Sequence, residues 1–474
     1  MKVWISRILI VLGIGLVLLI ALNWTIVRQF ARFSPIIITP PGLRSNDPVQ
    51  ARLNDIEYMG RFLRYDRSFN EEERAEFEQL IEASKADAAT MTDAELFMLA
   101  GEATALADNG HTYVNLGPVR REFNSVGVRF FTFSDGLYVV RARGDNVDLI
   151  GMRITALDDE PIDAVLDALE TYSGGMHHWR LFTSLLLLES PELLHAAGIT
   201  ESADGYTLTV AGPDGEEQDV ALDAYATDLD PDSPSTSKPW RNLSAQPLPD
   251  GGADWTYTLA DLAPGDVPLY LQDSDTYYVW AALEDGGGYM RFDESSNSRT
   301  QRMAEFFEQN VAALPDGSLE YVVVDLRPNW GGNSNLFVEP AQWLPDKVAE
   351  GGHVYVVVGP HTFSAGYNGA ALFDYYGGEQ SVLVGAPMGI RPQYWGDYGM
   401  DFNLPNTGWQ LAYATAYHDW ENGCDEHPYC HPQTVIHGVA AGDLTPNPII
   451  EPTYADYAAG RDVVLDWIMA QKAP

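Results

Sequence analysis

Residues 353–373 read HVYVVVGPHTFSAGYNGAALF, and this stretch decides the fold that the sequence predicts. It opens with a β-branched run typical of a buried strand. A Gly-Pro pair then ends the strand, and an apolar helical pattern follows. Ser364 therefore lies where a strand ends and a helix begins. A serine in this position either caps the helix or exposes a nucleophilic hydroxyl beside backbone N–H groups that can bind an oxyanion.

The same alternation of strand and helix extends through the second half of the chain. It predicts a largely parallel sheet covered by helices, which places this part of the protein in the α/β class. The predicted elements are a strand in YYVWAAL, a helix over 299–314, a strand over 321–326, a helix over 340–350, the strand over 353–358, the helix after Ser364, a strand over 381–384 and a closing helix in DYAAGRDVVLDWIM.

The first half of the chain has a different pattern. Residues 48–110 are typical of helices, with a capping box at Thr92 and Glu95, and Gly110 ends the last of them just before His111 and Thr112. From about residue 123 the pattern changes to short strands with one helix and a helical insertion. The domains that we expect are an anchor over 1–33, a helical region over 34–118, a strand-rich domain over 119–225, a linker over 226–255 and an α/β core over 256–474.

Composition limits the classes of partner. A chain of 474 residues is expected to form two or three domains. Its formal charge is −40, and it has only five lysines. Such a surface repels phosphate groups, so nucleic-acid binding is excluded. The acidity fits a saline or extracytoplasmic setting, and the oligomeric state is left open.

Residues 8–27 form an uncharged apolar run, ILIVLGIGLVLLIALNWTIV. Its length matches the roughly 20 residues that a helix needs to cross a bilayer. The run is longer than the core of a signal peptide, and no small-residue cleavage site follows it. The sequence therefore predicts a transmembrane signal anchor that holds the acidic body in the periplasm or outside the cell.

Cys424 and Cys430 are the only cysteines, in NGCDEHPYCHP. In an oxidising compartment a local disulfide is expected. A metal site is the competing interpretation, because His427 and His431 lie among the cysteines. No regular zinc spacing is matched, so we expect the disulfide, with no metal and no cofactor.

Two further segments carry polar groups where a sheet enzyme needs them. VVVDLRPNWGGN, residues 322–333, is a buried strand that ends in a Gly-rich turn. Gly331 and Gly332 let backbone N–H groups approach a ligand closely, although Asp325 and Arg327 equally fit a structural ion pair. His111 becomes a candidate base only if the fold brings it to Ser364.

Taken in order, these segments resemble the tail-specific (C-terminal processing) serine peptidases, in the branch that contains the tricorn core protease and interphotoreceptor retinoid-binding protein. The similar segments are VVVDLRPNWGG, VYVVVGPHTFSAG, VLVGAPMG, YWGDYGMDFNLPNTGWQLAYAT, EPTYADYAAGRDVVLDWIM, LADNGHT and, for a PDZ-like module, LIGMRITALDDEPIDAVLDAL. They span roughly residues 90–470, and an ordered set of this kind is more specific than any single motif.

The resemblance implies a crotonase-like core of ββα units and a PDZ-like α+β domain after the N-terminal helical segment. It also implies Ser364 as the nucleophile, with the oxyanion bound by the backbone N–H of Gly331 or Gly332 and of Ala365. The polypeptide substrate would add to the PDZ-like domain as a strand. The residues expected to support the site are Tyr367, Asp325, Arg327, Asn329 and Thr112.

The catalytic base departs from the Ser-Lys pattern of the family. No lysine lies between Lys347 and Lys472, and Arg391 cannot lose its proton near neutral pH. His111 is then the expected base, in a Ser-His arrangement of the tricorn kind. The acid that orients it stays open among Asp108, Asp419, Glu421 and Glu451.

Two other departures keep a second function open. Tyr367 stands where the family has glutamate, and Pro446-Asn447 stands where it has Pro-Asp. The predicted function is a membrane-anchored serine peptidase. The alternative is a non-catalytic protein that binds a ligand or peptide on the same scaffold.

Overall fold

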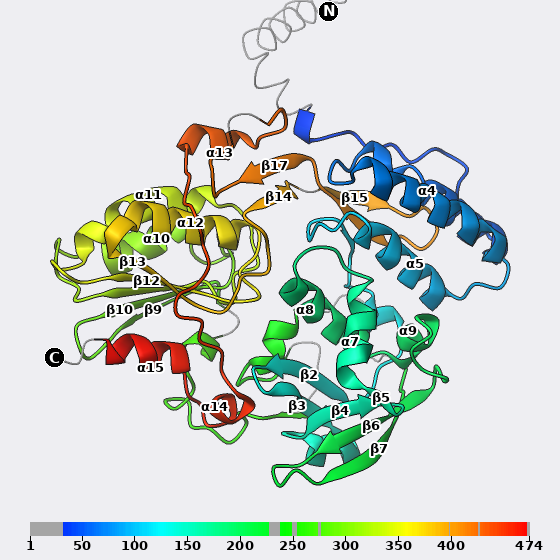
Figure 1. The fold of residues 1–474 in the computed structure, drawn as a ribbon, viewed down its shortest axis with the longest axis horizontal. Coiled ribbons are helices and arrows are strands. Elements are labelled where there is room, and N and C mark those ends of the chain that lie inside the picture. Colours follow the sequence, from blue (N-terminus) through cyan, green and yellow to red (C-terminus); the bar gives the residue numbers. More distant parts are fainter. Residues whose placement is uncertain are drawn as a thin grey trace, which may run out of the picture.

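A five-stranded sheet carries the segment that contains Ser364 (Figure 1). The computed structural model describes residues 32–226, 238–248, 254–273, 276–397, 399–424 and 427–471. The strand order is β13-β12-β11-β10-β9, in which β10 to β13 run parallel and β9 pairs antiparallel at the edge. The strands are β9 (Tyr278–Ala282), β10 (Gly288–Phe292), β11 (Val322–Asp325), β12 (Val354–Val358) and β13 (Ser381–Gly385). The predicted parallel sheet is confirmed.

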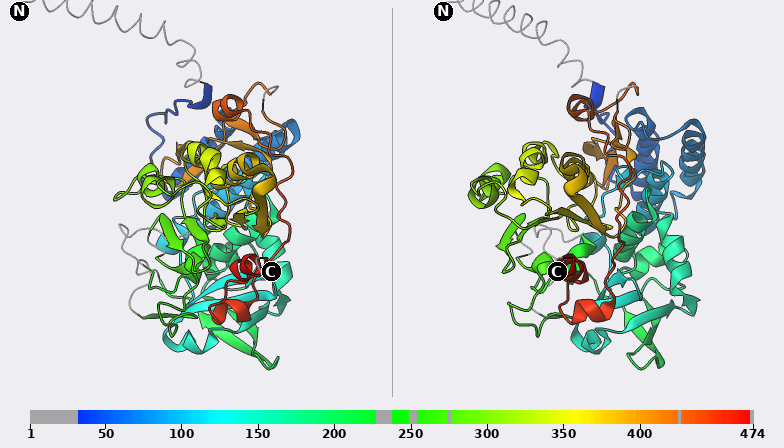
Figure 2. Two further views of the ribbon diagram at one scale, coloured as in Figure 1. Left: turned by 90° about the vertical axis from the view of Figure 1, so that its left-hand side faces the viewer. Right: turned by 60° about the vertical axis from the view of Figure 1, so that its left-hand side comes forward.

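Helices cover both faces of this sheet, as the second view in Figure 2 shows. They are α10 (Met303–Phe307), α11 (Asn335–Trp343) and α12 (Ala365–Gly377) on one face and α15 (Val463–Ala470) on the other. Val324 and Val356 face the first layer, and Val323 and Tyr355 face the second. Strands buried on both faces have no polar alternation, which is why β11 and β12 are continuous valine-rich runs.

One predicted helix boundary was wrong. The sequence placed a helix start at Pro340, where a proline is favoured in the first turn. In the structure α11 begins at Asn335, so Pro340 lies inside the helix and is buried against the core. Burial of this face against α12 outweighs the hydrogen bond that the proline nitrogen cannot donate.

A second, antiparallel sheet forms the lower part of the molecule in Figure 1, with order β2-β3-β4-β6-β7; β5 and β8 pair with β4 and β3. Its strands are β2 (Val128–Phe133), β3 (Gly136–Arg143), β4 (Arg153–Leu157), β5 (Glu160–Pro161), β6 (Gly205–Ala211), β7 (Glu217–Asp223) and β8 (Trp255–Tyr257). The helices of this part are α7 (Ile162–Glu170), α8 (His177–Leu187) and α9 (Pro191–Ala196). Together the two sheets make this a mixed α/β protein.

The N-terminal helices pack against a segment from the C-terminal half. These helices are α3 (Pro48–Met59), α4 (Glu71–Ser84), α5 (Asp93–Ala105) and the short α6 (Val119–Glu122). Phe402 stacks on Tyr58 with ring centroids 4.7 Å apart. β15 (Gly399–Asn403) pairs with β16 (Gln410–Tyr413), and β16 pairs with β1 (Tyr113–Val114). This small sheet fixes the loop that carries His111.

The remaining elements lie beside the Ser364 helix. β14 (Gln393–Gly396) pairs antiparallel with β17 (Ala416–Asp419), and α13 (Pro432–His437) follows. The chain then passes to α14 (Tyr454–Ala458) and α15. Figure 1 shows β14, β17 and α13 next to the layer that contains α12.

No helix in the described part of the chain is long and apolar enough to cross a membrane. The longest of those helices named above, α4, has 14 residues, against the roughly 20 that a span requires. This finding contradicts the prediction of a transmembrane signal anchor as far as the structure describes the chain. The apolar run 8–27, for which the prediction was made, lies outside the described residues.

Candidate active site

Ser364 occupies a strained turn between β12 and α12. Its backbone angles are φ 53° and ψ −123°, and its side chain makes no hydrogen bond to the helix that it precedes. The cap interpretation of this serine is therefore wrong. A residue other than glycine in this conformation costs about 1–3 kcal/mol, and such strain is concentrated at functional sites. A sharp strand-to-helix turn of this kind presents a serine hydroxyl above a sheet.

Gly331 lies directly against this serine. A Cβ atom on Gly331 would be 2.9 Å from Ser364 Cβ and 3.3 Å from its Oγ. Gly332 is equally confined, because its Cβ would be 2.4 Å from the carbonyl oxygen of Ser295. Both glycines have φ above 130°, a conformation that other residues rarely adopt. The Gly-rich turn is thus brought to the nucleophile candidate, as the sequence predicted.

The predicted oxyanion donors do not all remain available. The N–H of Gly331 donates to Asn329 Oδ1 at 3.1 Å. The N–H groups of Gly332 and Ala365 have no acceptor within the described residues. Asn329 therefore orients the turn, and of the three predicted donors only the N–H groups of Gly332 and Ala365 stay available.

The other predicted supporting residues are structural. Arg327 Nη2 pairs with Asp325 at 2.5 Å and with Asp462, at the start of α15, at 2.7 Å. Thr112 donates to Asp66 at 2.8 Å. Tyr367 is 1% exposed and belongs to the core between sheet and helices, and burial raises its pKa far above the ordinary range.

His111 lies beside the nucleophile segment. Its ring is 4.6 Å from the ring of Phe363, measured between centroids, and 5.2 Å from that of Tyr394. His111 and Ser364 line the same cavity of about 540 Å³. The missing side chain at Gly110 permits this approach, since a Cβ there would be 2.8 Å from Phe363.

The environment keeps His111 neutral. Burial lowers its pKa to about 3, and His418 lowers it too, whereas Asp397 and a hydrogen bond to the backbone of Trp395 raise it. The four acids predicted as orienting groups contact other partners or lie elsewhere: Asp108 pairs with Arg391, Asp419 and Glu421 accept from Gln393, and Glu451 lines a separate cavity. The two groups that raise the pKa of His111, Asp397 and the backbone of Trp395, are not among these four acids.

Sequence reasoning missed Asp397 and His418, and it considered His431 only as a metal ligand together with the cysteines. Asp397 Oδ2 lies 3.0 Å from His418 Nε2 and 3.2 Å from His431 Nε2. Against the penalty of burial, the hydrogen bond with His418 and the charges of the neighbouring imidazoles hold the pKa of Asp397 below its ordinary value. No local motif marks this group, because its members come from β14, β17 and the start of α13.

Six aromatic rings stack in one row past the nucleophile segment: Trp179, Phe363, His111, Tyr394, His418 and His431. Successive ring centroids are 3.9, 4.6, 5.2, 4.6 and 4.9 Å apart. Ser364 lies between the larger cavity and a polar one of about 260 Å³, which Asp397, His418 and His431 also line. The row therefore connects the walls of the two cavities on either side of Ser364.

Two lysines bear on the choice of base. Lys347 pairs with Asp316 at 2.8 Å and lines neither cavity at Ser364. Lys238, which the sequence gave no reason to consider, lines the larger cavity. Its Nζ pairs with Glu294 at 2.8 Å and lies 3.6 Å from the centre of the Trp330 ring. Burial lowers the pKa of the Lys238 amine, and the ion pair with Glu294 offsets that shift only in part.

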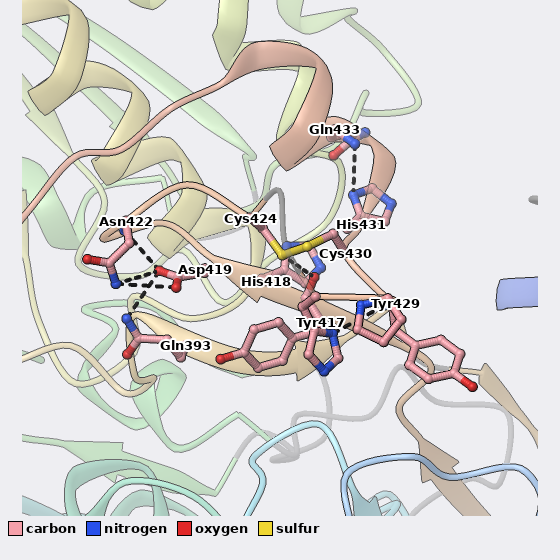
Figure 3. The surroundings of a disulfide bond; sticks show 12 residues. Gln393, Tyr417, His418, Asp419, Asn422, Cys424, Tyr429, Cys430, His431 and Gln433 are labelled. Atoms are coloured by element: carbon pink, nitrogen blue, oxygen red, sulfur yellow. Dashed lines mark hydrogen bonds between the residues drawn. A yellow bond between two sulfur atoms is a disulfide. The ribbon is translucent and has the colours of Figure 1, made fainter.

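Cys424 and Cys430 form a disulfide (Figure 3). It joins Cys424, in the turn after β17, to the residue before His431, and the backbone N–H of His431 donates to Tyr417 O at 2.8 Å. The disulfide thus holds the start of α13 against β17.

No protein family model matches the sequence, and no curated protein matches it. Three solved structures with a similar fold are a point mutant of CPAF (TM-score 0.53, 13% identity, 87% of this chain and 95% of that chain), mature CPAF (0.52, 12%, 89% and 96%) and mature CPAF complexed with lactacystin (0.51, 12%, 90% and 98%). Identity this low shows the fold alone. At that level the resemblance to tail-specific peptidases is confirmed.

Proposed function

We propose that the chain is a serine peptidase of the tail-specific kind, with Ser364 as its nucleophile and His111 as its base. The observation that carries the proposal is the strained turn at Ser364, packed against a glycine that leaves its hydroxyl uncovered. Strain of this kind persists only where the surrounding structure enforces it. A helix cap would need no such strain and would form the hydrogen bond that Ser364 lacks.

The residues divide the reaction as follows. Ser364 Oγ attacks the peptide carbonyl while His111 accepts the hydroxyl proton. The carbonyl oxygen becomes an oxyanion, which the N–H groups of Gly332 and Ala365 bind. His111 then gives the proton to the leaving amine, and water hydrolyses the acyl-enzyme by the same steps in reverse.

The low pKa of His111 has a defined consequence for this cycle. The ring is neutral in the resting site and so can accept a proton at any pH well above 3. A base so weak gains little by accepting that proton. The negative charge of Asp397 and the Trp395 backbone stabilise the imidazolium that forms, and they offset part of the burial penalty.

The arrangement of the chain supports a polypeptide substrate. Within the described strands β2 pairs only with β3, which leaves one edge of that sheet for an added strand. We propose that residues 119–225 form the PDZ-like domain, which presents the peptide, and that residues 256–474 supply the crotonase-like core. The disulfide and the acidic composition support a location in the periplasm or outside the cell.

Labelling with a fluorophosphonate tests the nucleophile. We expect wild type to be labelled and Ser364→Ala to be silent. Ser334→Ala is the matched control, because Ser334 lines the same polar cavity but lies outside the strained turn, and it should label as wild type does. His111→Gln should slow labelling, whereas Lys238→Met should leave a histidine-based reaction in place.

The second candidate function is a binding protein without catalysis. It is favoured by the size of the larger cavity and its aromatic lining, which includes Trp179, Phe182 and Trp240. Wild type that resists labelling, while remaining folded by circular dichroism, would decide for this function.

A further inference from the structure

Asp397, His418 and His431 bring three metal-binding side chains to one wall of the polar cavity. One donor atom from each lies within 4.8 Å of the others. Asp397 Oδ2 is 3.0 Å from one histidine Nε2 and 3.2 Å from the other. Donor atoms about 2.0–2.1 Å from a tetrahedral zinc ion are separated by roughly 3.3 Å. Two of the three donor pairs thus already have this spacing.

The backbone holds the three residues in fixed register. Tyr394 of β14 pairs with His418 of β17, and Gly396 pairs with Ala416, so Asp397 leaves β14 beside the start of β17. The disulfide ties Cys430 to Cys424, which brings His431 against the same strand (Figure 3). The sheet and the disulfide hold the backbone of the three residues, so ion binding requires changes in the side chains alone.

The cavity supplies access and room for further ligands. The Asp397 side chain is 38% exposed and that of His431 16%, whereas His418 is buried. The space of about 260 Å³ is lined by polar side chains, including Asn368, Ser334 and Gln433. Water can therefore complete the coordination, as it does in zinc sites with three protein ligands.

We propose that Asp397, His418 and His431 form a binding site for a divalent transition metal, with Zn²⁺ as the fitting ion. A set of two imidazoles and one carboxylate binds Zn²⁺ in preference to Mg²⁺ or Ca²⁺, because those two ions take oxygen ligands. The sequence predicted no metal and left a metal site at the cysteines only as the weaker alternative, and the disulfide removes both thiolates.

Metal binding requires defined changes in the two histidines. Each Nε2 that faces Asp397 must present its lone pair, so the ring proton moves to Nδ1 or leaves. The two rings are stacked, with an angle of 16° between their planes. Two rings that lie parallel do not both point a nitrogen lone pair at one ion. One ring must therefore turn, and His431 is the more exposed of the two. His431 then gives up the 3.3 Å bond that its Nδ1 accepts from Gln433 N.

Direct measurement of bound metal tests the site. Full-length protein without a histidine tag is stripped with a chelator and dialysed against Zn²⁺, and bound zinc is counted per chain. Co²⁺ then serves as a probe, because its visible absorption reports histidine and carboxylate coordination. We expect one ion per chain, and His431→Gln should weaken binding at least about tenfold.

Two further variants make the result decisive. Asp397→Asn keeps the size of the side chain but removes its charge, and should also lose the ion. His427→Gln is the matched control, because His427 lies in the same disulfide segment but outside the set, and it should bind as wild type does. Binding that survives His431→Gln and Asp397→Asn, or a folded wild type that binds no ion, would overturn the proposal.

A second readout rests on the proposed function, because it takes Ser364 as the nucleophile. An ion in the polar cavity neutralises Asp397 and occupies space next to Ser364, so Zn²⁺ should slow fluorophosphonate labelling of wild type. The Co²⁺ spectrum does not depend on Ser364. An ion that binds, together with no labelling of the metal-free protein, would contradict the peptidase alone, and labelling without a bound ion would contradict the metal site alone.

Discussion

At the scale of single residues, the candidate site depends on two glycines as much as on the polar groups. Gly331 leaves Ser364 uncovered, and Gly110 lets the His111 loop reach Phe363. In each place a methyl group would overlap the neighbouring side chain. The geometry of the candidate site therefore depends on the absence of side chains at these two glycines. A methyl group added at either one should reduce reactivity at Ser364 more than it reduces the stability of the fold.

Gly331→Ala should abolish labelling of Ser364. The added Cβ would lie 2.9 Å from Ser364 Cβ, and φ of 137° is itself unfavourable for alanine. Gly351→Ala is the control, since Gly351 has φ 83° with open space around it and so carries the backbone cost of about 1–3 kcal/mol without the overlap. Both variants are compared by labelling and by urea unfolding. If Gly331→Ala labelled normally, Gly331 would not border the reactive hydroxyl.

At the scale of elements, the strand that leads to the Gly-rich turn is tied to the C-terminal helix by charge. Arg327 follows β11 and pairs with Asp325 and Asp462. Asp462 also accepts from the N–H groups of Val464 and Leu465 at the start of α15. One buried carboxylate thus caps a helix and neutralises an arginine, which fastens α15 to its face of the sheet.

Asp462→Ala should lower the free energy of unfolding by about 2–4 kcal/mol, because Arg327 keeps Asp325 but loses its charged hydrogen bonds to Asp462, and α15 loses its cap. The matched control is Asp466→Ala in the same helix. Asp466 is 56% exposed and pairs with Arg461 at 3.2 Å, so its loss should cost less than about 1 kcal/mol. Urea unfolding of both variants measures the difference. Equal small losses would mean that α15 contributes little through this contact.

At the scale of the whole molecule, buried histidines link stability to pH. His361 lies between the two sheets, enclosed by the rings of Phe131, Phe182 and Trp240. Neither ring nitrogen has a hydrogen-bond partner in the described part of the chain. Burial lowers its pKa to about 3, against 6.5 in an unfolded chain. Between these values the unfolded state binds a proton that the folded state does not.

The free energy of unfolding should fall as the pH is lowered. The stability that neutral His361 contributes is fully present above about pH 6.5 and is lost as the pH falls toward 3. His361→Phe removes this proton uptake, so its loss of stability between pH 7 and pH 5 should be smaller than that of wild type by about 2 kcal/mol. Urea unfolding at the two pH values checks this. Equal losses in both proteins would show that His361 is protonated in the fold.

The sequence by itself determined the parts of this protein that follow from local pattern. Valine-rich runs separated by helices specified the parallel sheet, because such strands must be buried on both faces. The break after Val358 placed Ser364 at the end of a strand, and Thr92 with Glu95 marked the start of α5, where the capping box forms. The glycine pair after β11 followed from the same local reasoning.

Only the tertiary structure decided which polar groups meet. The local sequence around Ser364 fitted a helix cap as well as a nucleophile, and its backbone angles excluded the ordinary cap. Asp397, His418 and His431 are far apart in the sequence, and pairing of β14 with β17 and a disulfide bring them together. Periodicity encodes burial along one element, whereas convergence of side chains depends on how elements pack, so the environment of His111 and the metal-binding group had no local signature.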